Sequence, residues 1–224
     1  MHIGEVWRQQ FYQLWWQKKL RLILVLLTLL LAGLCWRQTQ RAATGSQLQG
    51  LIFERFNLLI IYFPISLFLT LHNFQHRLTD YGATRTNDVW VKQDIANIIL
   101  AQLTLTGCFV LGTFIGLNCS GKIMLVSWPV WFGFIYLLLG QLFLSFMLVM
   151  ICRLTHSKPV SFMLVFGFIG LDFWLLISKR ISLLLIMTAP RTWRQWGLLT
   201  GLLLLLIDFC VCLNFALAER TVGQ

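Results

Sequence analysis

Residues 123–152 read IMLVSWPVWFGFIYLLLGQLFLSFMLVMIC, a run of 30 residues without a charged side chain. A helix needs about 20 apolar residues to cross the hydrocarbon core of a bilayer, so this run is long enough to span a membrane. The run is continuously apolar instead of alternating every second residue, which favours a helix over a strand of a membrane barrel. This stretch therefore predicts a helical membrane protein.

Five further apolar windows flank this run on both sides, and apolar residues make up 58% of the chain against 12% charged residues. A soluble domain has roughly a quarter charged residues. We therefore predict an all-α polytopic membrane protein in which residues 1–224 form one transmembrane domain with no separate soluble domain. The predicted spans cover about 20–36, 56–76, 95–117, 129–152, 160–178 and 195–218.

Two other segments are expected at the membrane surface or within one leaflet. Residues 3–19 place apolar side chains on one helical face, with tryptophans and basic ends, as in helices that lie in the bilayer interface. Packing against a partner protein is the alternative for this helix. Residues 181–190 are apolar but too short to span, and they predict a re-entrant segment between spans five and six.

The net charge of +10 indicates contact with lipid headgroups in a chain of this composition, and nucleic acid is not an expected partner. If the N-terminus is cytoplasmic, the cytoplasmic segments hold 10 Lys and Arg and the opposite segments hold 8. We predict cytoplasmic N- and C-termini from this small excess and from the four positive charges that precede the first span.

The longest strongly polar stretch between spans is DYGATRTNDVWVKQD, residues 80–94. Gly82 permits a turn, and Thr86 or Asn87 is a candidate N-cap of a helix that continues into span three. The exposed residues of this stretch mix aromatic and basic character, which suits a docking surface. An ordinary cytoplasmic loop with aromatic residues at the membrane interface is the alternative interpretation.

Two acids, Asp172 and Asp208, fall inside predicted spans five and six. A charged residue at the membrane centre costs about 2.5–3.5 kcal/mol on insertion scales, so such residues usually face protein or a functional path. One hypothesis is a proton- or substrate-linked acid pair. The alternative is that each acid is protonated, or hydrogen-bonded to a polar group on another helix.

Motifs for chemistry within this chain are weak. Residues 116–122, GLNCSGK, have the glycine and lysine spacing of a phosphate-binding loop, but Ile123 stands where a serine or threonine would bind magnesium. The six cysteines lie in or beside apolar windows without metal-ligand spacing, so no metal site is predicted. No catalytic residues are predicted, and the chain is not expected to be an enzyme.

The order of segments resembles the permease subunits of type-2 ATP-binding-cassette transporters. Residues 81–93, YGATRTNDVWVKQ, are similar to the coupling helix between spans two and three of some bacterial permeases of this kind. The resemblance implies that an ATPase subunit docks on five residues of this segment. These residues are Tyr81, Thr84, Arg85, Trp90 and Lys92.

The resemblance also implies a bacterial plasma-membrane location, a second permease copy or homologue, and ATP and magnesium bound on the partner ATPase. The expected function is export of an amphipathic peptide, lipid or drug-like molecule. Two alternatives remain open: an ATP-independent membrane binding or immunity protein, and a proton-coupled transporter that uses Asp172 and Asp208.

Overall fold

The structure is a computed structural model, and it describes residues 18–40, 42, 44–75, 87–179, 182–185, 187 and 192–220. These residues form helices and short connections, with no strand among them. Six helical segments within them are long and apolar enough to cross a membrane. Their bounds are Arg21–Thr39, Gly45–His72, Val91–Cys119, Trp128–Thr155, Lys158–Ser178 and Trp193–Leu217. The prediction of a six-helix membrane fold is confirmed at this level.

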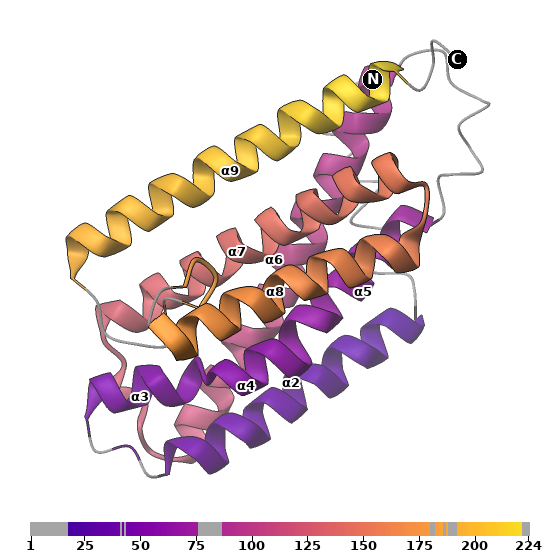
Figure 1. Ribbon diagram of the computed structural model, residues 1–224. Helices are drawn as coiled ribbons and strands as arrows, with labels where there is room; N and C mark the ends of the chain where they lie inside the picture. Colours follow the sequence, from indigo (N-terminus) through magenta and orange to yellow (C-terminus); the bar gives the residue numbers. More distant parts are fainter. Residues whose placement is uncertain are drawn as a thin grey trace.

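The helices follow one another in an antiparallel bundle (Figure 1). The five long helices are α2 (Lys18–Thr39), α6 (Asn87–Cys119), α7 (Trp128–Thr155), α8 (Lys158–Lys179) and α9 (Trp193–Arg220). The second span is made of α3 (Gly45–Ile52), α4 (Arg55–Asn57), the π-helix η1 (Leu58–Tyr62) and α5 (Phe63–Gln75), and the 3-10 turn η2 (Ile123–Leu125) precedes α7. At one end of the bundle α5 ends and α6 begins, and we call it the 76–86 end.

Helix α7 is the centre of the bundle, because 61% of its apolar window is buried, against 17% for α9. The continuous apolar sequence of α7 has no polar face to turn to water, which suits a helix surrounded by other helices. Helix α9, yellow in Figure 1, lies along one edge of the bundle. The position of α9 leaves a long face of this helix without a neighbour among the described residues.

Helices α2 and α6 approach each other closely because small residues line their contact. An ideal Cβ on Gly112 would lie 2.8 Å from the Thr28 carbonyl oxygen, and one on Gly116 would lie 2.6 Å from the Ala32 carbonyl oxygen. Glycines four residues apart lie on one helical face and let two membrane helices pack backbone to backbone. The sequence Gly112-x-x-x-Gly116 thus fixes where α2 rests on α6.

The second span differs from the expected single helix over 56–76. It starts at Gly45, earlier than the predicted start at residue 56, and the Thr44 side chain caps α3 by accepting a hydrogen bond from the Gln47 amide at 3.4 Å. Leu48 is fully buried, which explains why this piece folds as a helix instead of a free loop. Pro64 lacks an amide hydrogen, and the π-helix η1 ends two residues before it, at Tyr62.

An aromatic cluster fills the space where α3, η1, α6 and α7 meet. The Phe53 ring lies 5.2 Å from the Phe134 ring, and the Tyr62 ring lies 4.9 Å from the Phe109 ring, measured between centroids. Gly133 allows this arrangement, because a Cβ there would lie 2.3 Å from the Phe53 ring. Phe53 is fully buried at the break between α3 and α4, so the break directs this ring into the core.

Polar side chains also connect α5, α6 and α7 inside the bundle. The Gln102 amide donates to the hydroxyls of Thr70 at 3.0 Å and Ser145 at 2.9 Å, while its carbonyl oxygen accepts from the Ser66 hydroxyl at 2.8 Å. Away from water these groups must satisfy one another, and such bonds contribute about 0.6 kcal/mol each in membrane proteins. This network holds three central helices in a fixed register.

Two predicted segments are not settled. The interfacial helix predicted over 3–19 lies outside the described residues, apart from Lys18 and Lys19, which begin α2. Within the predicted re-entrant segment, residues 182–185 are described and have irregular backbone, while most of its other residues are outside the described part. The described residues therefore test neither the interfacial helix nor the re-entrant segment.

Candidate functional site at the 76–86 end

The predicted docking segment is described only where it has become helix α6. Tyr81, Thr84 and Arg85 lie outside the described residues, and so does the side chain of Trp90. The Lys92 side chain is exposed. Helix α6 begins at Asn87 and continues for 33 residues to Cys119, so the last part of the segment and the third span are one helix. The prediction of a helix running from this polar stretch into the membrane agrees with that continuity.

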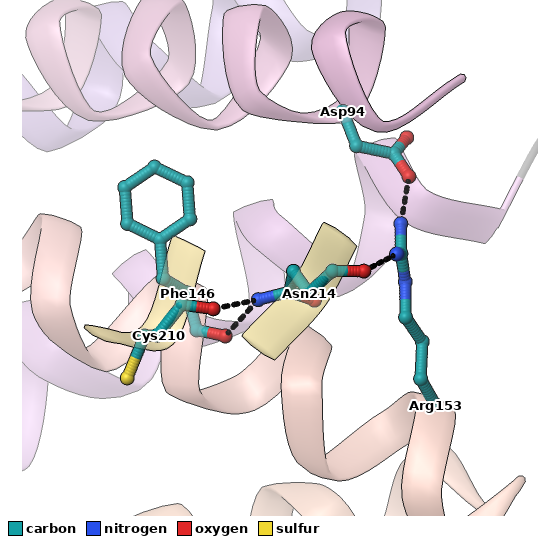
Figure 2. A network of polar contacts seen from close by, with 5 residues as sticks. All are labelled: Asp94, Phe146, Arg153, Cys210 and Asn214. Carbon is teal, nitrogen blue, oxygen red and sulfur yellow. Dashed lines mark hydrogen bonds and ion pairs between the residues drawn. The ribbon is translucent and has the colours of Figure 1, made fainter. Parts of the chain in front are cut away.

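Two residues after Lys92, α6 makes a buried ion pair with the end of α7. The Arg153 guanidinium donates through Nη2 to the Asp94 carboxylate at 2.9 Å, and both side chains are only 8% exposed. Figure 2 shows Arg153 reaching across from its helix to this acid. The two charged groups thus join the start of α6 to the end of α7.

The same guanidinium also binds α9. Arg153 donates through Nη1 to the backbone carbonyl oxygen of Asn214 at 2.7 Å. The Asn214 side-chain amide in turn donates to the carbonyl oxygens of Cys210 at 2.9 Å and Phe146 at 3.2 Å (Figure 2). We call Asp94, Arg153 and Asn214 the ion-pair cluster. It is a direct polar connection among α6, α7 and α9 near the 76–86 end.

We expect the ion-pair cluster to be sensitive to the loss of either charged member, Asp94 or Arg153. Taking two charges out of water carries a large desolvation penalty that their attraction offsets, so removing one partner of a buried pair costs about 3–5 kcal/mol. The Arg153 Nε and the Asn214 Oδ1 are buried and have no hydrogen-bond partner among the described residues. The cluster therefore combines two strong contacts with two polar atoms that the described protein groups leave unsatisfied.

Asp172 lies far along α8 from this end and holds the irregular residues that follow the helix. Its carboxylate accepts from the Ser182 hydroxyl at 2.6 Å, the Leu183 amide at 2.7 Å and the Leu184 amide at 3.2 Å. Asp172 is 4% exposed, and the Ser182 hydroxyl also accepts from the Leu185 amide at 2.8 Å. The buried acid is thus satisfied by backbone and hydroxyl donors, which favours the structural interpretation of this residue.

Two further side chains bind the same stretch of chain. The Tyr136 hydroxyl of α7 donates to the Leu183 carbonyl oxygen at 2.5 Å, and the Gln49 side chain of α3 donates to the Met187 carbonyl oxygen at 3.0 Å. Residues 182–185 and 187 are therefore tied to α3, α7 and α8 at once. We call these five residues the anchored segment.

Asp208 has a different environment from Asp172. It lies near the middle of the 28-residue helix α9, its side chain is exposed, and it makes no hydrogen bond or ion pair with any residue that the structure describes. The described contacts thus do not join the two acids. The structure gives the hypothesis of an acid pair no support.

The ion-pair cluster was not singled out from the sequence, although a signal for it exists. Asp94 directly precedes the apolar window 95–121, and Arg153 directly follows the window 123–152. Consecutive antiparallel spans place these two window borders at the same end of the bundle. Opposite charges at such matching borders therefore identify a candidate ion pair, whereas Asn214 offers no comparable signal.

In the part of the chain that the structure describes, no three His, Cys, Asp or Glu side chains gather into a possible metal site. Comparison with known proteins gives no match, since no family, no curated protein and no solved structure matches this chain.

Proposed function

We propose that this chain is the transmembrane subunit of an ATP-driven transporter, and that a separate ATPase chain acts on it through residues 81–93. The observation that carries this proposal is the buried ion pair between Asp94 and Arg153. Residues 87–93 belong to the same continuous helix as Asp94, so a displacement of the segment moves the acid directly. Because Arg153 belongs to α7, the displacement reaches the central helix of the bundle.

The contacts of Arg153 extend this route to α9. The guanidinium holds Asp94 and the Asn214 carbonyl oxygen at once, at 2.9 Å and 2.7 Å. Breaking a buried charge from its partner is unfavourable, so the helices joined by such a contact move together or change between discrete arrangements. A push on the 81–93 segment is thereby converted into a rearrangement of three spans.

In this proposal ATP and magnesium bind to the partner ATPase and not to this chain. The phosphate-loop-like residues 116–122 end α6 and form the following turn, at the end of the bundle opposite to the 76–86 end. That position separates them from the segment on which the ATPase docks. The partner therefore supplies hydrolysis, and this chain supplies the membrane path together with a second permease copy or homologue.

The substrate class proposed is amphipathic, and the direction is export. Large apolar side chains are exposed along α2, α8 and α9, including Leu26, Trp174 and Leu205 at 57%, 60% and 70%. Surfaces of this kind bind lipid tails or the apolar part of a peptide or drug-like molecule. The proton-coupled alternative has less support, because Asp172 is engaged with the anchored segment and Asp208 is exposed on α9.

The test is site-specific crosslinking in the native host. A photocrosslinking amino acid replaces Arg85 in the docking segment, and in a control protein it replaces Met124, which is 92% exposed near the opposite end. We expect the Arg85 position to capture a soluble chain that hydrolyses ATP, and the Met124 position to capture none. Capture of no ATP-hydrolysing chain at any position tested across 81–93 would contradict the proposal.

A further inference from the structure

The exposed face of α9 carries an acid in the middle of a membrane span. With 100° per residue, Gly201, Leu205, Asp208 and Cys212 fall on one stripe of this helix. Leu203 and Cys210, fully buried and 4% exposed, lie on the opposite side. Asp208 therefore points away from the bundle, at a depth where a single-chain protein would meet only lipid.

The same face is open to close approach by another helix. A Cβ built on Gly197 or on Gly201 would meet no atom within 4 Å among the described residues. Gly112 and Gly116 on α6 are also four residues apart, but there atoms of α2 lie within 3 Å of a Cβ built on either glycine. One pair is therefore occupied by a helix of this chain, and the pair on α9 has no partner among the described residues.

We propose that this face of α9 binds a transmembrane helix of a different protein that places a lysine or arginine at the depth of Asp208. Charge complementarity selects this occupant. An acid removed from water is stabilised by an opposite charge within about 4–6 Å. The open glycines allow the partner backbone to approach closely enough for a basic side chain to reach the carboxylate.

A second copy of this chain fits the face less well. Two copies share one orientation in the membrane, so packing α9 against α9 would bring the Asp208 carboxylates toward each other at equal depth. Like charges in this arrangement disfavour each other. Elsewhere in the described chain, Arg153 is already paired with Asp94. Arg55 lies within the second span but ten residues from its start at Gly45, whereas Asp208 lies fifteen residues from the start of the sixth span at Trp193. The other described lysines and arginines lie near helix ends. Among the described residues, a copy therefore offers no cation at the depth of Asp208.

The proposal is independent of the ATPase contact, which lies on the 81–93 segment. Its test uses the full-length protein in liposomes, with a donor fluorophore on a C-terminal tag. The probe is a synthetic leucine-alanine transmembrane peptide with one central lysine and an acceptor fluorophore, and the matched peptide has leucine at that position. We expect energy transfer to the lysine peptide to exceed transfer to the leucine peptide. Asp208→Leu is expected to abolish the difference.

Two glycine variants form a matched control. Gly201→Leu places a large side chain on the proposed face and is expected to lower transfer to the lysine peptide. Gly167→Leu on α8 changes a glycine that is equally open and should leave transfer unchanged. Equal transfer to both peptides with the unmodified protein would overturn the proposal. Transfer between two labelled copies of this chain that depends on Asp208 would overturn it as well, since the occupant would then be a second copy.

Discussion

At the scale of single residues, two buried polar side chains set how the helices meet at the two ends of the bundle. Arg153 joins α6, α7 and α9 near the 76–86 end, and Asp172 holds the anchored segment at the other end. Buried charge is stable only when donors and acceptors match it, so these positions tolerate substitution poorly. Their contacts can be tested one residue at a time.

Replacing Arg153 with methionine removes the cation and leaves Asp94 buried without its partner. We expect the variant to lose about 3–5 kcal/mol of folding stability. Thermal unfolding in mild detergent measures this loss as a lower midpoint temperature. The control is Lys92→Met, which removes an exposed cation from α6 at the same end of the bundle and should leave the midpoint nearly unchanged. Equal midpoints for the Arg153 variant and the unmodified protein would show that the pair contributes little.

Replacing Asp172 with leucine removes the acceptor for the Leu183 and Leu184 amides. Hydrogen bonds to charged groups contribute about 1.5–3 kcal/mol, so we expect amide hydrogen exchange at these residues to become at least about tenfold faster. Exchange measured by mass spectrometry on peptides covering 182–185 checks this expectation. Asp208→Leu changes the other intramembrane acid and should leave this exchange unaffected, because Asp208 makes no described contact there.

At the scale of helices, the contact between α2 and α6 depends on the absence of side chains at two positions. Gly112 and Gly116 lie against backbone atoms of Thr28, Ala32 and Trp36, which cannot move aside as a flexible side chain can. Helix α2 is exposed over most of its other faces, so this contact is its main attachment to the bundle. The sequence of one helix thereby determines the position of another.

Gly116→Leu is expected to push α2 away from α6 and to lower the stability by about 1–3 kcal/mol, the usual effect of overpacking a close contact. The midpoint of thermal unfolding in detergent measures the effect. Gly107→Leu on the same helix is the control, because a Cβ at Gly107 meets no described atom within 4 Å. Similar midpoints for the two variants would contradict the assignment of this contact.

At the scale of the whole molecule, an even number of antiparallel spans brings the first and last described residues, Lys18 and Arg220, to the same end of the bundle. The ion-pair cluster lies near that end, while the turn at 120–122 and the anchored segment lie at the other end. This arrangement gives each end of the bundle a separate task. In the proposed function one end receives the partner ATPase, and at the other end hydrogen bonds hold the anchored segment against α3, α7 and α8.

Reporter fusions check this arrangement and the predicted orientation. We expect a fluorescent protein fused at residue 1 or residue 224 to fluoresce, as it does in the cytoplasm. A phosphatase that is active only outside the cytoplasm should be active when inserted after Ser120 and inactive at either terminus. Termini on opposite sides would contradict six spans, and both termini outside would reverse the predicted orientation.

The sequence by itself determined the fold class and the number of spans. Continuous apolar runs longer than about 20 residues have few stable alternatives to membrane helices, because backbone groups in lipid must bond within their own segment. The predicted borders at 129–152 and 195–218 lie close to the helical spans Trp128–Thr155 and Trp193–Leu217 for this reason. Hydrophobicity is a local property, and it can be counted along the chain.

The tertiary structure decided which polar residues meet, although the charges at matching window borders already made Asp94 and Arg153 a candidate pair. Asp94, Arg153 and Asn214 come from three helices, and their contact depends on packing that no single segment encodes. The two intramembrane acids looked alike in sequence, yet Asp172 is buried among donors and Asp208 faces outward. Which side of a membrane helix faces its neighbours follows from how side chains interlock across helices, because every face of such a helix is apolar enough for lipid.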